Sequence, residues 1–194
     1  MGAVGAIETM TGSSPQEAFG ILCQQMQREY GEDPYNGTLS TCNLGRCVKR
    51  FGKYSETNKK QAYKLIDKAF EDGTAQKWRA NYIDLGVKKY IVTEYKLKKM
   101  SNSPKYKIGY IVKSNVETDR YFSSKTEAYD YALKTAPRGG YLWIEKGYYL
   151  MEGNSRIAEV EANVKEYKKK PARIKAGAHV EEVHEYIFFG YAAE

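Results

Sequence analysis

The chain has 194 residues, 42% of them hydrophobic and 28% charged, with a formal net charge of +7 and an isoelectric point near 9.1. The length favours one domain of ordinary size, and the composition is that of a soluble globular protein rather than a disordered or membrane-spanning one. The basic balance favours an anionic partner, although a solvated surface explains it equally well. Tyrosine is unusually frequent, with 18 residues, which suits half-buried strands and polar interfaces.

Cys23, Cys42 and Cys47 are too few and too irregularly spaced for a disulfide framework, so we expect a reducing compartment. Residues 1–12 have no basic beginning and contain Glu8, so we do not interpret them as a signal peptide. No apolar run approaches the length of a membrane span. We therefore predict a cytoplasmic protein without a membrane partner.

The first two elements are marked by their boundaries. Residues 3–10 alternate weakly and predict a strand. In the segment that follows, Ser14 fits a helix N-cap, Pro15 fits the first turn, and Glu17 stands three residues after the cap. The predicted helix ends at Gly31.

A second helix is predicted from near Ser55 to Asp72, where an Asp-Gly pair closes it. The period of the pattern then changes. Residues 82–100 and 105–114 read as two strands, joined by the polar turn SNSP into a hairpin.

Alternation along this hairpin separates apolar from charged side chains. Val87 and Ile91 share the inner face with Ile108, Tyr110 and Val112. The outer face collects the residues that we call the basic sheet face: Lys88, Tyr90, Lys96, Lys98, Lys105, Lys107 and Lys113. Lysines beside an aromatic ring can hold phosphates and stack bases, but lysines also protect edge strands from aggregation. Because lysine outnumbers arginine here, base-specific reading is not indicated.

The second half of the chain begins with a short predicted strand at 120–123. Ser124 and Glu127 then repeat the capping pattern and predict a third helix. Residues 156–167 fit either a strand or a helix. We choose a strand, because the turn EGNS beside this segment favours a hairpin.

The closing residues 179–194 are rich in Val, Ile, Phe and Tyr and predict a central strand. Residues 165–178 are basic and are interrupted by proline and glycine, so we interpret them as a flexible linker within a single domain, 1–194. Adjacent strands with helices before and between them predict an α+β fold with a mainly antiparallel sheet and about three helices.

The segment EDPYNGTLSTC, residues 32–42, holds an Asn-Gly turn beside three hydroxyl residues. It can serve as a structural turn, or its hydroxyls can donate to a phosphate. A glycine-rich phosphate loop is not present in its sequence. The second interpretation predicts an anion pocket formed by Tyr35, Asn36, Thr38, Arg46, Lys49 and Arg50.

His179 and His184 are separated by an odd number of residues, so on a strand they point to opposite faces, which argues against a shared metal. One of them can pair with a carboxylate as an acid–base couple, or the segment can be a polar strand edge. A cysteine nucleophile would need a base that only the fold could bring close. The carboxylates, Asp84 among them, show no spacing that indicates paired catalysis. We predict no metal and no cofactor, assign no catalytic residue, and favour a non-enzymatic role.

The segments GEDPYNGTLSTC and HEYIFFGYAAE resemble small accessory proteins encoded by tailed bacteriophages, in which a Tyr-Asn-Gly-Thr segment follows an N-terminal helix. The resemblance covers only these segments and carries no catalytic residues. It implies a protein made in a bacterial host cytoplasm that binds a host or defence component.

Two hypotheses follow. In the first, the basic sheet face engages nucleic acid or an acidic protein surface of the host or its defences. In the second, the anion pocket sequesters or cleaves a small phosphorylated or nucleotide ligand. The sequence leaves the oligomeric state open.

Overall fold

A computed structural model describes residues 2–31, 33, 35–95, 106–114, 120–122, 124–135, 142–144, 149–152, 155–159, 162–175 and 178–193. The chain forms two compact units, residues 1–90 with 182–194, and residues 91–181. Two long strands, β3 (Arg79–Tyr95) and β10 (His179–Ala193), run from one unit into the other. The sequence predicts a single domain and gives no sign of this division.

One sheet has the order β1-β10-β3-β2, and β9 (Ala162–Tyr167), a strand of the second unit, also pairs with β3. β1 (Ala3–Gly12) lies antiparallel to β10, from Ala3 opposite Ala193 to Gly12 opposite His184. β2 (Asn43–Arg50) lies parallel to β3, with two register shifts. β10 therefore has a neighbour on both sides, which confirms the central strand predicted from its apolar composition.

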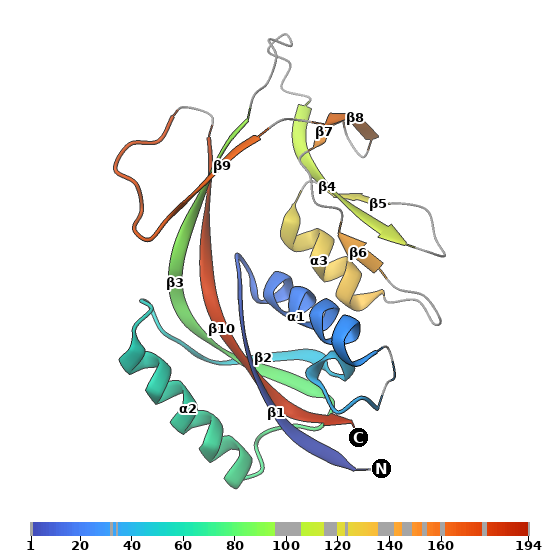
Figure 1. Cartoon of the computed structure of the whole chain (residues 1–194), viewed down its shortest axis with the longest axis vertical. Coiled ribbons are helices and arrows are strands. Elements are labelled where there is room, and N and C mark those ends of the chain that lie inside the picture. Colours follow the sequence, from blue (N-terminus) through green and yellow to red (C-terminus); the bar gives the residue numbers. More distant parts are fainter. Residues whose placement is uncertain are drawn as a thin grey trace. The chain divides into compact units, whose positions relative to one another are not determined.

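One helix covers each face of this sheet (Figure 1). Side chains alternate across a strand, so Ile187 and Phe189 of β10 face one way and Phe188 faces the other. α2 (Glu56–Glu71) packs Ile66 into a core cluster with Ile187 and Phe189. α1 (Pro15–Tyr30) packs Phe19 against Phe188, with ring centroids 5.3 Å apart. Burial on both faces explains the continuous apolar run near the end of the chain.

The helices begin and end at the residues that the sequence indicates. Ser14 caps α1 by accepting a hydrogen bond from the backbone N–H of Glu17 at 3.1 Å, and Gly31 ends the helix with a φ of 85°. The Glu17 carboxylate reaches back to the backbone N–H of Ser13 at 2.9 Å, one residue before the usual capping-box partner. Ser55 caps α2 through its side-chain oxygen. Both predicted helices are confirmed.

The second unit contains a sheet with the order β5-β4-β7-β8, and β6 also pairs with β4. α3 (Lys125–Lys134) begins after Ser124, as predicted, and packs Tyr131 against Phe122 with ring centroids 5.2 Å apart. In the described part of this sheet, β4 lies antiparallel to its three neighbours, and β7 lies antiparallel to β8. Its strands are β4 (Tyr106–Ser114), β5 (Arg120–Phe122), β6 (Leu142–Ile144), β7 (Tyr149–Glu152) and β8 (Ser155–Glu159).

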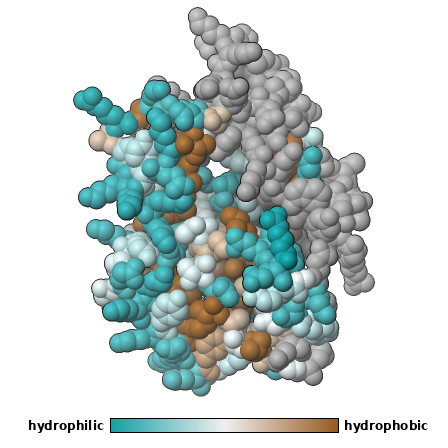
Figure 2. All heavy atoms as spheres, in the orientation of Figure 1, coloured by the Kyte–Doolittle hydropathy of each residue, from teal (hydrophilic) through white to brown (hydrophobic). Residues whose placement is uncertain are grey.

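β7 and β8 form the predicted hairpin. β8 and β9 together cover most of residues 156–167, so the choice of strand over helix is confirmed. The fold is α+β with mainly antiparallel strands, which confirms the predicted class. Among the described residues, no helix is both long and apolar enough to cross a membrane. In the view of Figure 2, hydrophilic side chains cover most of the outer side of α2.

The hairpin predicted from residues 82–100 and 105–114 is wrong for the described part of both strands. β3 lies in the sheet of β10 and β2, whereas β4 pairs with β5, β6 and β7. β4 also has no solvent-facing side at its centre, because the adjacent residues Ile111 and Val112 are both buried. Alternation and a polar turn are typical of hairpins, but they do not determine whether two successive strands pair with each other.

The basic segment interpreted as a linker, 165–178, begins inside a regular element, because β9 extends to Tyr167. Residues 168–175 form no helix or strand, and most of their side chains are exposed. The ammonium of Lys175 lies 2.9 Å from the carboxylate of Glu94 on β3. This ion pair holds the segment at one point.

Candidate anion-binding site

The Asn-Gly turn predicted as part of an anion pocket satisfies its own polar groups. The side-chain oxygen of Asn36 accepts hydrogen bonds from the N–H and the hydroxyl of Thr38, at 3.0 and 2.8 Å. Gly37 has a φ of 72°, as such a turn requires, and its N–H donates to the carbonyl of Ala193 at 2.7 Å. Thr38 then caps the short 3₁₀-helix Leu39–Thr41. The segment therefore fits a structural connection, and Asn36 and Thr38 bind each other.

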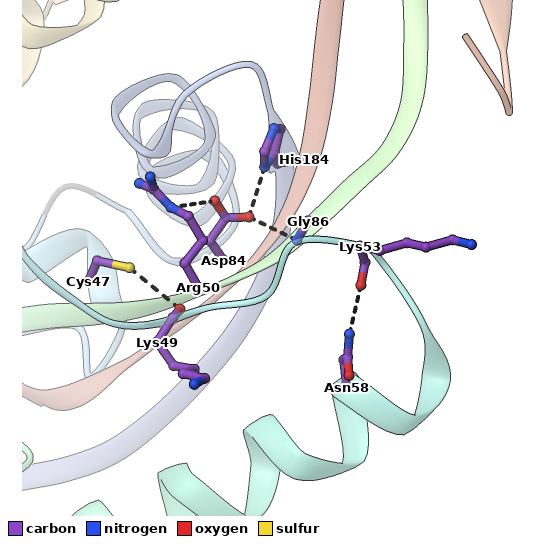
Figure 3. Close-up of polar contacts among 8 residues, drawn as sticks. All are labelled: Cys47, Lys49, Arg50, Lys53, Asn58, Asp84, Gly86 and His184. Carbon is purple, nitrogen blue, oxygen red and sulfur yellow. Dashed lines mark hydrogen bonds and ion pairs between the residues drawn. The ribbon is translucent and has the colours of Figure 1, made fainter.

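The remaining residues of the predicted pocket are Tyr35, in the loop, and Arg46, Lys49 and Arg50, on the edge strand β2, and all four are exposed. The Lys49 ammonium lies 5.8 Å from the centroid of the Phe51 ring. Figure 3 shows the side chains of Lys49 and Arg50 on opposite sides of β2. Of the three cations, Arg50 is the one whose side chain contacts a buried polar group.

Arg50 and His184 meet at the carboxylate of Asp84 on β3 (Figure 3). The Nε of Arg50 lies 3.2 Å from Oδ2 of Asp84, and the Nδ1 of His184 lies 2.8 Å from Oδ1. The side chain of Asp84 is 3% exposed, whereas those of Arg50 and His184 are 70% and 24% exposed. A buried acceptor thus holds two basic side chains that reach solvent. We call these three residues the Asp84 cluster.

The backbone at Gly86 supplies a third contact to this carboxylate, beside the ion pair with Arg50 and the hydrogen bond with His184. The N–H of Gly86 donates to Oδ1 of Asp84 at 2.9 Å. Gly86 has a φ of 96°, and a Cβ at this position would lie 2.8 Å from backbone atoms of Lys53 and Tyr54. The connection from β2 to α2 therefore passes directly over the strand here, and only glycine fits.

The rings beside the cluster set the direction of His184. Its ring stacks on Tyr186, with centroids 5.9 Å apart and planes inclined by 13°. Because Asp84 binds Nδ1, the opposite ring nitrogen, Nε2, is directed away from the carboxylate, and it forms no hydrogen bond within the described part of the chain.

Burial, and then the charge of Asp84, raise the pKa of the Tyr186 hydroxyl. Burial also raises the pKa of Tyr82. Both phenols are therefore neutral near pH 7.

The Asp84 cluster can bind an anion. Asp84 uses the Nε of Arg50, which leaves the two terminal guanidinium nitrogens as paired donors for a phosphate or carboxylate. A neutral His184 that donates from Nδ1 has an acceptor at Nε2, and protonation turns this nitrogen into a second donor for the anion. The same nitrogen can take or give a proton.

Of the basic sheet face, the structure describes the side chains of Lys88, Tyr90 and Lys113. Lys88 forms an ion pair with Glu185, and its ammonium lies 5.4 Å from the centroid of the Tyr54 ring. Tyr90 and Lys113 are half-buried and lie on strands of different sheets. Outside the described residues lie Lys96, Lys98 and Lys105, together with the side chain of Lys107.

The three cysteines are free thiols. Burial, and then the neighbouring Cys42, raise the pKa of Cys23 to about 12. Burial likewise raises the pKa of Cys42. Cys47 is half-buried, and its sulfur lies 3.5 Å from the carbonyl oxygen of Lys49. Within the part of the chain that the structure describes, no three His, Cys, Asp or Glu side chains gather as a metal site.

Sequence reasoning considers a carboxylate partner for His184 but misses Asp84, because the two residues are 100 positions apart. A signal is nevertheless present. Asp84 interrupts the apolar run YIDLGV, in which Ile83 and Leu85 are fully buried. A charge inside such a strand requires a partner from elsewhere in the fold.

No protein-family model, curated protein or solved structure matches this chain. Its function therefore has to be inferred from the residues themselves, and the Asp84 cluster is the arrangement with the clearest chemistry.

Proposed function

We propose that this chain is a binding protein for a phosphate-bearing ligand, held by Arg50 and His184 of the Asp84 cluster. The observation that carries the proposal is the position of the buried Asp84 carboxylate between these two side chains. It binds one nitrogen of each and leaves their other nitrogens for a ligand. Donors that are already oriented lose little conformational freedom when the ligand binds.

The surroundings favour a phosphate over a carboxylate. Arg46 on the same edge strand is exposed and adds positive charge, which suits a group that carries more than one negative charge. The net charge of +7 acts in the same direction. The resemblance to phage accessory proteins supplies a context, in which the ligand is a nucleotide or another phosphorylated molecule of the host or its defence system.

The proposal is tested by titration calorimetry with pyrophosphate and with AMP near neutral pH. We expect saturable binding of both ligands. Arg50→Gln and His184→Gln should each weaken binding about tenfold or more, as the loss of a hydrogen bond to a charged group predicts.

Lys64→Gln is the matched control, because it removes one positive charge from an exposed position on α2. It should leave the affinity almost unchanged. The proposal is wrong if neither ligand binds, or if Lys64→Gln weakens binding as much as Arg50→Gln does. The calorimeter also records slow heat release from turnover, which would separate cleavage of the ligand from sequestration.

The basic sheet face, and with it the binding of nucleic acid or an acidic host protein, stays a prediction. Lys96, Lys98 and Lys105 lie outside the described residues, and Lys88 is engaged by Glu185. No contact in the described part of the chain favours this role over the Asp84 cluster, so we do not propose it as a second function.

A further inference from the structure

Trp78 has an unusual backbone conformation. Its φ is 64°, and among the described residues it is the only residue other than glycine with a positive φ. Bulky side chains rarely adopt this left-handed region, because the Cβ then approaches the following carbonyl. The conformation is fixed from both sides: the N–H of Trp78 donates to the carbonyl of Tyr191 at 3.1 Å, and its carbonyl accepts from the N–H of Asn43 at 2.9 Å.

The ring of Trp78 contributes little to the core. The residue is 39% exposed and does not belong to the apolar cluster beneath α2. Within the described part of the chain the indole makes no stacking or cation–π contact. Glycine would adopt the same backbone conformation without strain. A strained and exposed tryptophan that glycine could replace is therefore a candidate for contact with a ligand.

Two cations are the chain neighbours of Trp78. Lys77 and Arg79 are both exposed, and their backbones are fixed, because Lys77 bridges to Tyr191 and Arg79 pairs with Asn43 of β2. An aromatic plane beside positive charges is the combination with which proteins bind nucleotides and single-stranded nucleic acid. An acidic peptide would not need the ring, and an apolar partner would not need the charges.

We infer that Trp78, Lys77 and Arg79 form a nucleotide-binding platform, on which a nucleobase stacks on the indole while its phosphate contacts Arg79 or Lys77. The inference goes beyond the phosphate site proposed above. From Arg79 to Asp84 the strand advances five residues, about 17 Å at the usual rise per residue. The platform therefore does not use Arg50 or His184.

The experiment uses the fluorescence of Trp78. The chain has two tryptophans, so Trp143→Phe leaves Trp78 as the only one, and excitation at the long-wavelength edge of the absorption avoids the 18 tyrosines. This protein is titrated with thymidine monophosphate, with a thymidine hexanucleotide and with an abasic hexamer of the same phosphate charge. We expect saturable quenching by both thymidine ligands and none by the abasic hexamer.

Affinity for a dye-labelled thymidine hexanucleotide is then measured by anisotropy for two variants. Trp78→Gly should weaken binding by about 5- to 150-fold, the usual effect of losing one stacked base. Its fold should be retained, because glycine suits the left-handed conformation. Trp78→Phe keeps an aromatic ring and should retain most of the affinity. A loss of affinity in Trp78→Gly alone is then caused by the missing ring, whereas a loss in both variants would indicate misfolding.

Equal affinity for the abasic and the thymidine hexamer would overturn the inference, as would unchanged binding by Trp78→Gly. Stronger quenching by the hexanucleotide would assign the platform to single-stranded nucleic acid, and equal quenching by the monophosphate would assign it to a free nucleotide. Arg50→Gln separates the two proposals. It should weaken pyrophosphate binding at the Asp84 cluster and leave the quenching of Trp78 by thymidine monophosphate unchanged. If this variant lost both, the inference that Trp78 belongs to a separate site would be wrong.

Discussion

Lys59 on α2 and Glu185 on β10 form an ion pair in the interior of the first unit, with Nζ and Oε1 3.0 Å apart. Glu185 is 1% exposed, and Lys88 of β3 binds its other oxygen. Burial alone would raise the pKa of this carboxyl, but hydrogen bonds from Lys88 and Lys59 outweigh the burial, and the pKa is lowered from its ordinary value of 4.5. One carboxylate therefore ties a helix to two neighbouring strands.

Glu185→Gln is expected to lower the free energy of unfolding by about 1–3 kcal/mol at neutral pH, because both lysines lose their charged acceptor. The pKa of Glu185 is lower in the folded than in the unfolded chain, so its stabilising contribution is present above about pH 4.5 and is lost as the pH falls through the folded-state pKa. The stabilities of wild type and variant should therefore converge on acidification. Urea unfolding at a series of pH values measures both effects.

Glu182→Gln is the control for this prediction, since Glu182 lies on the same strand and is exposed. Its free energy of unfolding should stay within about 0.5 kcal/mol of wild type. A difference between Glu185→Gln and wild type that stays constant down to acidic pH would contradict the role assigned to the Glu185 charge.

Asp84→Asn should disrupt the Asp84 cluster with almost no change in volume. The amide presents an NH₂ group either to the Nε of Arg50 or to the Nδ1 of His184 and the N–H of Gly86, so a donor replaces an acceptor on one side. We expect a loss of about 1–3 kcal/mol in the free energy of unfolding, together with weaker pyrophosphate binding. Urea unfolding and calorimetry on the same preparation measure the two quantities.

Asp67→Asn makes the same chemical change at an exposed position of α2 and should alter neither quantity. If Asp84→Asn bound pyrophosphate as tightly as wild type, the carboxylate would not be what positions Arg50 and His184.

The local part of this fold follows from the sequence. Ser14 with Glu17, Ser55, and the Asn36-Gly37 pair mark helix ends and a turn, because caps and turns are formed by groups only a few residues apart. Alternation likewise places β3 and β4 close to their observed bounds.

Partner choice does not follow in the same way. β3 pairs with β10 rather than β4, and Asp84 pairs with His184 across 100 positions, because burial of apolar area over the whole unit decides which strands become neighbours. The same long-range effect gives Lys88 a buried partner in Glu185, although its own strand pattern predicts a lysine free in solvent.

Gly86→Ala should destabilise the protein by more than about 1 kcal/mol, because alanine does not tolerate a φ of 96° and its Cβ would overlap the backbone of Lys53 and Tyr54. Gly52→Ala is the matched control in the same connection, with no atom within 4 Å of the added Cβ. It should be neutral or slightly stabilising. Thermal unfolding of the two variants side by side measures the contrast, and equal melting temperatures would show that the connection does not press on the strand.

The burial of the cysteines predicts the order in which they are alkylated. The thiolate is the reactive form, and burial, with Cys42 next to it, raises the pKa of Cys23 to about 12, so this thiol stays protonated at mildly alkaline pH. Cys42 is buried and its pKa is raised too. Cys23 and Cys47 are both half-buried, so it is the raised pKa of Cys23 that separates these two thiols. We therefore expect iodoacetamide to modify Cys47 first in the folded protein, and Cys23 and Cys42 only after unfolding in urea.

Peptide mass mapping at successive times identifies the modified cysteine. Cys47→Ser should abolish the fast reaction. The other two thiols should react in urea as they do in the wild type, and their reaction is the internal reference for each sample. Rapid alkylation of Cys23 in the folded wild type would contradict the raised pKa of this thiol, because only the thiolate reacts.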